Sequence, residues 1–200
     1  MNTVYVLGEN LYLNITNQCT NRCIFCIRNF TSKVGNKNLW LEREPTSQEI
    51  INEIKSYFPL RKFKEIVFCG FGEPLLRVNV VKKVIEFIKT YEPSVFIRID
   101  TNGHGNIFHQ RNILVDLKDL VDSISISLNA ENSEKYNKIC RPVFENAYEE
   151  LLEFIKLAPK YIKNVQVTVV DIPSIDKSLC EKIAETLGVK FYVRSFLRSL

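Results

Sequence analysis

The stretch "LYLNITNQCTNRCIFC", residues 11–26, joins a strand-like pattern to three closely spaced cysteines. Residues 11–16 alternate in polarity and carry β-branched and aromatic side chains, which is typical of a β-strand. Cys19, Cys23 and Cys26 follow at once, and no fourth cysteine or histidine lies near them in the sequence. Three soft ligands directly after a strand predict a metal-binding loop with one ligand position left open.

The length of 200 residues predicts a single domain, residues 1–200, large enough to bury a core without disulfides. The composition, 46% apolar and 25% charged, is that of an ordinary globular protein. The apolar runs are too short to span a membrane, and the N-terminus lacks the pattern of a signal peptide. We therefore expect a cytoplasmic protein with reduced cysteines and no membrane partner. The net charge of +4 is too small to indicate a partner.

Strand and helix patterns alternate along the whole chain. The helix from Thr46 starts with a capping box completed by Glu49, and the last helix is predicted from a cap at Ser174 to a stop at Gly188. The apolar periodicity predicts three further helices, near residues 81–88, 113–120 and 147–158. The predicted strands are residues 11–16, 65–70, 94–100, 123–128, 164–170 and 190–196.

Six strands alternating with five helices predict an α/β fold built on a parallel sheet. The pattern is compatible with a doubly wound sheet or with an incomplete barrel, and both bind ligands at the carboxyl ends of the strands. The unusual segments of the sequence lie at those ends: the cysteine loop, "GFGEP" at 70–74, "DTNG" at 100–103 and "LNA" at 128–130. We expect these segments to meet on one face of the domain as an active site.

Two kinds of metal site compete for the three cysteines. A [4Fe-4S] cluster needs one outside ligand for each iron, so three thiolates leave one iron free to bind a small molecule. A structural zinc ion normally takes four protein ligands. The ligand count favours the cluster, and a zinc-binding, non-enzymatic interaction module remains the alternative.

The CxxxCxxC loop, with Phe25 before its last cysteine, resembles the signature of the radical S-adenosylmethionine (radical SAM) superfamily. "GFGEP" resembles the GGEP motif of that superfamily, with Phe71 in place of the usual second glycine. The resemblance implies a partial (β/α)6 TIM-like barrel, the radical SAM core. The short length and "DTNG" resemble the activases of glycyl-radical enzymes, such as pyruvate formate-lyase activating enzyme, and more closely the short TatD-linked radical SAM proteins.

The resemblance also implies roles for individual residues. Cys19, Cys23 and Cys26 would bind the cluster, whose open iron would bind the amino and carboxylate groups of SAM. The residues implied to contact SAM are Gly70, Phe71, Gly72 and Glu73 beside the methionine part, Asp100 and Asn102 at the ribose, Ser127 and Asn129 at the ribose or carboxylate, Arg141 at the carboxylate, and Phe25, Val170 and Ile172 at the adenine.

The implied chemistry is that of the cofactors. A reduced cluster splits SAM into methionine and a 5′-deoxyadenosyl radical, which takes a hydrogen atom from an unreactive C–H bond. The implied partners are an electron donor such as flavodoxin or ferredoxin and an unidentified substrate. Because no further domain is apparent after the sixth predicted strand, we expect a laterally open barrel that accepts a large substrate, such as a protein loop or a nucleic acid.

Several other residues invite a functional interpretation. Cys69 and Cys180 are expected to fill the core. Cys140 is expected to pack as well, although the neighbouring Arg141 leaves a role near an anion open. His104 and His109 are expected to be solvated in a loop. Residues 28–45 lack helical periodicity and are expected to form a flap over the cluster or to pack on a helix.

Overall fold

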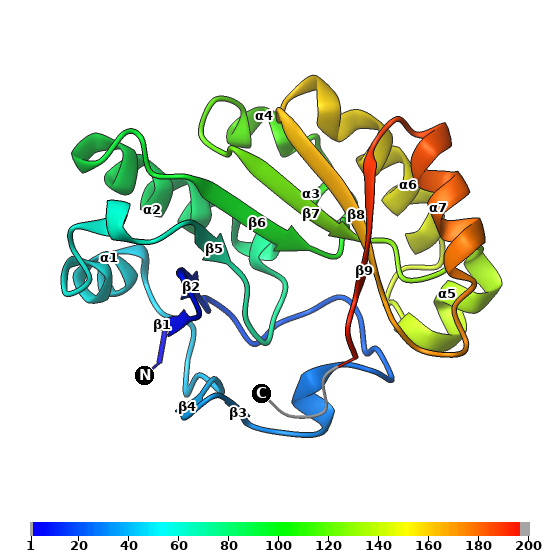
Figure 1. Cartoon of the computed structure of the whole chain (residues 1–200), viewed down its shortest axis with the longest axis horizontal. Coiled ribbons are helices and arrows are strands. Elements are labelled where there is room, and N and C mark those ends of the chain that lie inside the picture. The colour runs from blue at the N-terminus through cyan, green and yellow to red at the C-terminus, as the bar shows by residue number, and fades with distance from the viewer. Residues whose placement is uncertain (1, 197–200) are drawn as a thin grey trace.

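The computed structural model describes residues 2–196, which form a curved seven-stranded sheet with helices along one face (Figure 1). The order of strands across the sheet is β1-β2-β5-β6-β7-β8-β9. The strands of this sheet are β1 (Val4–Leu7), β2 (Asn10–Leu13), β5 (Ile66–Phe68), β6 (Ile97–Thr101), β7 (Ser123–Ser127), β8 (Asn164–Val170) and β9 (Lys190–Arg194).

The six predicted strands are the six parallel strands of the sheet, β2 and β5 to β9. Each is a neighbour of the next in chain order, and all five pairs between them are parallel. A doubly wound sheet would reverse this order at a switch point. The sequential order therefore excludes the doubly wound alternative and confirms the incomplete barrel.

Strand β1 was not predicted. It pairs antiparallel with β2 through a tight hairpin, in which Gly8 has a φ of +59°. Glycine adopts this left-handed conformation without steric penalty, so "VYVL" followed by Gly8 was the available signal. The prediction of six strands was therefore one strand short for this sheet, and the two strands of a separate hairpin, β3 (Lys33–Val34) and β4 (Lys37–Asn38), were not predicted either.

The helices differ from the sequence expectations mainly in short segments. Thr46 and Glu49 form the predicted capping box, whereas the last helix is capped by Asp176 instead of Ser174. Helices α3 and α5 were not predicted because each is too short to show a clear period. The α-helices are α1 (Ser47–Lys55), α2 (Val78–Tyr91), α3 (Gly105–His109), α4 (Leu114–Leu117), α5 (Ser133–Cys140), α6 (Ala147–Leu157) and α7 (Lys177–Thr186). The 3₁₀-helices are η1 (Ile27–Asn29), η2 (Leu60–Lys62), η3 (Pro74–Arg77) and η4 (Ala158–Lys160).

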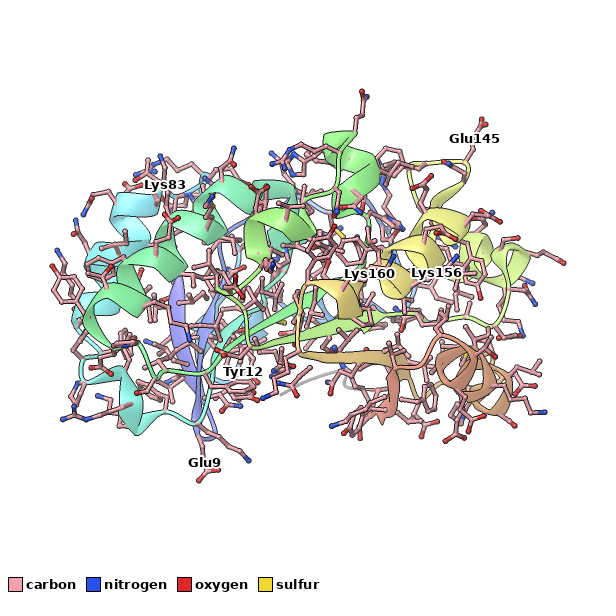
Figure 2. All side chains as sticks on the ribbon, turned by 90° about the horizontal axis from the view of Figure 1, so that it is seen from above. Glu9, Tyr12, Lys83, Glu145, Lys156 and Lys160 are labelled. Carbon is pink, nitrogen blue, oxygen red and sulfur yellow. The ribbon has the colours of Figure 1, made fainter. Side chains whose placement is uncertain are left out.

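The alternation of side chains along the strands separates two faces of the sheet. In β7, Ile124 and Ile126 belong to the main hydrophobic core under the helices, whereas Ser125 alternates with them and accepts a hydrogen bond from Gln166. Figure 2 shows the helical layer from above, with the exposed Lys83 projecting from α2. The convex face is thus apolar and covered by helices, and the concave face is polar.

None of the helices among residues 2–196 is long and apolar enough to cross a membrane.

Candidate functional site

The cysteine loop follows β2 and lies at the carboxyl edge of the parallel sheet, opposite the helical layer in Figure 1. Two backbone hydrogen bonds fasten it to the end of α5: Arg22 N–H donates to the carbonyl of Cys140, and Ile24 N–H to that of Ile139, both over 2.9 Å. Cys19, Cys23 and Cys26 are each half-buried and free of disulfides. These backbone contacts fix the loop against α5.

The three thiols have different surroundings. Burial raises the pKa of Cys19 to about 12, and the nearby Glu73 carboxyl acts in the same direction. A hydrogen bond from the buried Cys140 thiol lowers the pKa of Cys23. Cys140 therefore packs, as expected, but it also contacts one of the predicted ligands.

A single-ion site does not form around these thiols. Within residues 2–196, no group of three or more cysteine, histidine, aspartate or glutamate side chains converges on a point that could hold one metal ion. The number of thiolates in the loop, three, therefore stays the argument for a cluster over a zinc ion.

The "GFGEP" segment lies against the loop that leads to the cysteines. A Cβ atom on Gly72 would stand 2.4 Å from the carbonyl oxygen of Thr16 and 2.5 Å from that of Gln18. Glu73 N–H donates to the same Gln18 carbonyl over 2.7 Å. Because only glycine permits this approach, the residue at position 72 determines how closely the two loops can pack.

The Glu73 carboxylate is buried and joins "GFGEP" to the end of β6. It accepts hydrogen bonds from Thr101 Oγ1 at 2.7 Å, Asn102 N–H at 2.6 Å and Leu75 N–H at 3.0 Å. Burial raises the pKa of Glu73 to about 7, against the effect of these donors. Its predicted place beside the methionine part of SAM stays a prediction.

The packing of Phe71 accounts for a phenylalanine where the GGEP motif usually has its second glycine. It is buried beside Tyr5, Val34 and Leu39, and its ring meets Trp40 edge to face at 5.2 Å. These partners come mainly from residues 28–45, which contain a small hairpin of β3 (Lys33–Val34) and β4 (Lys37–Asn38).

Residues 28–45 are also anchored by side chains from the end of β2. Asn14 Nδ2 donates to the carbonyl of Leu39 over 2.7 Å, and the Asn14 oxygen accepts from Phe71 N–H over 3.1 Å. Asn17 exchanges two hydrogen bonds with the backbone of Leu41. The segment packs on "GFGEP" and also contacts helices α1 and η3 through the ion pairs Arg43–Glu49 and Glu44–Arg77, and its predicted role as a flap over a cluster stays a prediction.

The "DTNG" segment places its two polar side chains in different surroundings. Asp100 lies on the concave face, bound to Arg98 and close to the Cys69 thiol. Burial raises the pKa of Asp100, while Arg98 and Arg194 act against that rise. Cys69, which we expected to fill the core, is half-buried close to Asp100 and is not part of the main hydrophobic core.

Asn102 faces the cysteine loop. Its Nδ2 group donates to Thr20 Oγ1 over 2.8 Å and lies 3.7 Å from Cys19 Sγ, while its Oδ1 atom accepts from His104 N–H over 3.0 Å. Each polar atom of the Asn102 side chain therefore has a partner in the protein. Its ribose contact stays a prediction.

The histidines do not lie in solvent, and this prediction was wrong. His104 is fully buried and bonds Thr20 and Tyr136 through its two ring nitrogens. His109 is half-buried with its Nε2 atom 2.9 Å from the carbonyl of Leu75. The glycines on either side of His104 are typical of an open loop, and its partner Tyr136 is far away in the sequence.

Other predicted SAM contacts lie at the ends of the later strands. Ser127 ends β7, and Asn129 follows it with a φ of +57°, a conformation that asparagine tolerates. Val170 ends β8, and Ile172 follows it, buried against the core. Phe25 is half-buried and packs against the main core from the cysteine loop.

Arg141 does not join this group. It is exposed at the end of α5, with a φ of +49°, and lines a hollow of about 650 Å³ together with Arg22 and Glu145. This placement adds no support to its predicted contact with the SAM carboxylate.

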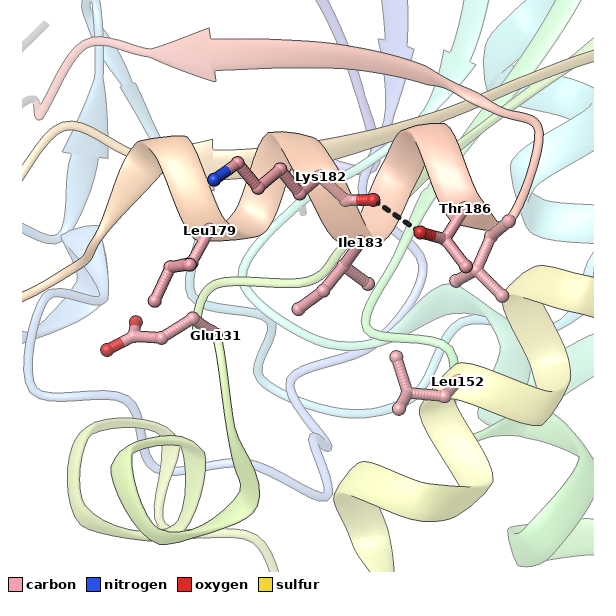
Figure 3. Close-up of a pocket in the computed structure, with 7 residues that line it drawn as sticks. Glu131, Leu152, Leu179, Lys182, Ile183 and Thr186 are labelled. Carbon is pink, nitrogen blue, oxygen red and sulfur yellow. Dashed lines mark hydrogen bonds between the residues drawn. The ribbon is translucent and has the colours of Figure 1, made fainter.

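Two further hollows differ in their relation to the cysteines. One of about 680 Å³ is lined by Cys19, Thr20 and Arg28 and by side chains of α3 and the loop after α5. Figure 3 shows the other, of about 370 Å³, between α6 and α7, where Leu152, Leu179 and Ile183 make it apolar. The first borders the candidate site, and the second lies in the helical layer.

A sequence model of the radical SAM superfamily matches residues 13–187, which include the cysteine loop and all six parallel strands except the start of β2 and the whole of β9. The chain belongs to the radical SAM superfamily. Proteins of this superfamily bind a [4Fe-4S] cluster and S-adenosylmethionine.

Relatives of known sequence cover most of the chain. An uncharacterized protein of Methanocaldococcus jannaschii is 28% identical over 88% of this chain and 52% of its own length. The GTP 3′,8-cyclase of Lactiplantibacillus plantarum is 28% identical over 82% of this chain and 46% of its own. The chain thus spans about half the length of these relatives.

The fold has close counterparts among solved structures. A structure of TYW1 with a lysine–pyruvate adduct bound superposes with a TM-score of 0.66, covers 96% of this chain and 67% of its own, and shares 14% sequence identity. At this identity the likeness concerns the fold alone, and it agrees with the partial barrel.

The chemistry of the residues around the cysteine loop fits an iron–sulfur cluster. Three thiols are available within eight residues. Asn21 N–H and the Asn102 amide donate toward Cys19 Sγ at 3.4 and 3.7 Å, and the Cys140 thiol donates toward Cys23. Hydrogen-bond donors aimed at the sulfurs are the usual outer partners of such clusters.

Proposed function

We propose that this radical SAM protein is an enzyme in which Cys19, Cys23 and Cys26 hold a [4Fe-4S] cluster by three of its irons. The fourth iron would then be free to bind the amino and carboxylate groups of SAM. The observation that supports this best is the contact between the cysteine loop and "GFGEP", made by the Gly72 approach and the hydrogen bond from Glu73 to Gln18.

When bound, the reduced cluster supplies the electron that splits SAM into methionine and a 5′-deoxyadenosyl radical. The protein's own residues then have three tasks: to orient SAM, to keep water out and to hold the substrate C–H bond beside the radical. The segments at 70–73, 100–102 and 127–129 end neighbouring strands, which supports the proposal that they contact SAM. The Asp100 carboxyl, which pairs with Arg98, would orient SAM through hydrogen bonds.

The test of the cluster is direct. Protein reconstituted without oxygen should contain about four irons and four sulfides per chain, show the electron paramagnetic resonance signal of a reduced [4Fe-4S] cluster, and convert SAM to 5′-deoxyadenosine with dithionite. The triple Cys19, Cys23, Cys26→Ala variant should stay folded and lose all three properties. Colourless protein with one tightly bound zinc, and a triple variant that unfolds, would instead establish the zinc module.

We propose further that the substrate is large and that the chemistry is of the oxidoreductase or activase type, as in the glycyl-radical enzyme activases and the TatD-linked proteins. One feature supports a large substrate. Within residues 2–196, β9 is an edge strand on which Tyr192 and Val193 are exposed, so they would offer contacts to a large partner. A flavodoxin or ferredoxin in the cytoplasm would supply the electron.

The size of the substrate can be measured by isotope transfer. Candidate partner proteins and RNA pools that carry deuterium on carbon are incubated with SAM and the reduced enzyme. Deuterium is then sought in 5′-deoxyadenosine. Transfer from a polymer supports the proposal. Transfer from a free metabolite at comparable rates contradicts it and leaves the cluster assignment intact.

A further inference from the structure

The sulfur of Cys19 lies beside a connected set of buried polar residues. Thr20, Asn21, Asn102, His104 and Tyr136 are each less than one tenth exposed. We call these five residues the Cys19 brace. They come from three separate parts of the chain: the cysteine loop, the segment after β6, and α5.

The contacts of the brace form a ring that begins and ends at Cys19. Asn102 Nδ2 lies 3.7 Å from Cys19 Sγ and 2.8 Å from Thr20 Oγ1, which is 2.9 Å from His104 Nδ1. The other ring nitrogen, Nε2, is 3.0 Å from Tyr136 Oη. Asn21 Nδ2 donates to that same hydroxyl over 3.0 Å, and the Asn21 backbone N–H returns to Cys19 Sγ at 3.4 Å.

A neutral imidazole satisfies the hydrogen bonds at the central ring of the brace. A neutral ring has one donor and one acceptor, which matches the hydroxyls of Thr20 and Tyr136, whereas a charged ring has two donors. Burial lowers the pKa of His104 to about 4, so the neutral form is the one present at physiological pH. Packing also fixes the ring, since Tyr136 and Phe144 both meet it edge to face at 6.0 Å.

We propose that the Cys19 brace is a positioning device for the cluster, in which Asn102, His104 and Tyr136 aim two hydrogen-bond donors at Cys19 Sγ and thereby raise the reduction potential. Reduction adds negative charge to the cluster and its sulfurs, so donors directed at a ligand sulfur stabilise the reduced state more than the oxidised one. The inference rests on the proposed function, because it requires a cluster at Cys19. It assigns to Asn102 a task separate from binding ribose.

The brace acts through defined atoms, so conservative variants can separate its effect from general damage. Tyr136→Phe removes the hydroxyl that links His104 and Asn21. Tyr148→Phe is the matched control: Tyr148 is also buried and its ring packs against that of Tyr136 at 5.5 Å, but its hydroxyl donates to the carbonyl of Ala130 over 3.1 Å and not to a polar group of the brace. Asn102→Leu removes the side-chain donor without adding charge.

The experiment is a redox titration of reconstituted protein without SAM, followed by electron paramagnetic resonance. At a fixed potential, Asn102→Leu should lower the ratio of reduced to oxidised cluster about tenfold, a shift of the midpoint by about −59 mV for one electron. Tyr136→Phe should shift it in the same direction by a smaller amount. Tyr148→Phe should lose similar thermal stability to Tyr136→Phe and keep the wild-type midpoint.

The outcomes are distinct from those of the proposed function. A wild-type protein that forms no cluster would end the proposed function itself. If the wild type forms a cluster but Asn102→Leu and Tyr136→Phe both keep its midpoint potential, the proposal of the brace alone is overturned. An equal shift of the midpoint potential in Tyr148→Phe would overturn it as well. If Asn102→Leu does not retain a cluster, the comparison of Tyr136→Phe with Tyr148→Phe decides by itself.

Discussion

Replacing Gly72 with alanine should separate the cysteine loop from "GFGEP". The added Cβ would meet the carbonyl oxygens of Thr16 and Gln18 at 2.4 and 2.5 Å. An ordinary carbon–oxygen contact is about 3.3 Å, so the two loops must part by about 0.9 Å. The φ angle of Gly72 is not in the left-handed region, which makes the penalty purely steric.

The size of the effect follows from two contributions. Overpacking of a close contact costs about 1–3 kcal/mol. Parting the loops also weakens the hydrogen bond from Glu73 N–H to the Gln18 carbonyl, which contributes about 1 kcal/mol. We expect Gly72→Ala to lose roughly 2–4 kcal/mol of unfolding free energy, which corresponds to a fall of roughly 5–15 °C in melting temperature.

The assay has two readouts, urea unfolding of the metal-free protein and iron content after reconstitution. Gly8→Ala is the control, because a Cβ at Gly8 meets nothing within 4 Å and only its positive φ is penalised, by about 1 kcal/mol. Gly72→Ala should be the less stable variant and should hold less iron. Equal stability of the two variants with full iron in both would refute the reasoning.

Four further predictions concern single side chains. Glu73→Gln should cost about 1–3 kcal/mol in urea unfolding, because an amide cannot accept from all three donors around it; wild-type stability would contradict this. Phe71→Ala should lose about 3 kcal/mol by the same assay and release residues 28–45 to proteolysis. Cys140→Ala should keep its full iron content, since Cys140 is placed as a hydrogen-bond donor to Cys23; loss of one iron would make it a ligand. The pKa of His104 is lowered from 6.5 to about 4, so its unfolded state binds the proton first. The contribution of the neutral His104 to the free energy of unfolding is therefore fully present above pH 6.5, and it should fall by roughly 3 kcal/mol as the pH drops to about 4. His104→Gln should reduce that fall.

The parallel strands could be predicted because their period is local. In β6, apolar Ile97 and Ile99 alternate with polar Arg98 and Asp100, a pattern that is visible within a few residues. In the structure the two sets lie on opposite faces of the sheet. The cysteine loop was equally visible, because its spacing lies within eight residues.

What could not be predicted depends on contacts between distant residues. His104 is bonded to Thr20, 84 residues away, and to Tyr136, 32 residues away, and no local pattern reports such partners. Phe71 looked like a departure from a motif until the hairpin of residues 33–38 was seen to pack near it. Side-chain pairing of this kind is decided by the fold and is not visible in the order of residues.

The outer edge of β9 has a consequence for self-association. A second copy of β9 added antiparallel about Tyr192 would place Lys190 opposite Arg194 twice, at each end of the pair. Like charges directly opposite one another destabilise a strand pair, and lysine on an edge strand is a common safeguard against aggregation. Pairing of two molecules through their β9 strands is therefore unfavourable. A different chain with acidic side chains opposite Lys190 and Arg194 would be attracted instead.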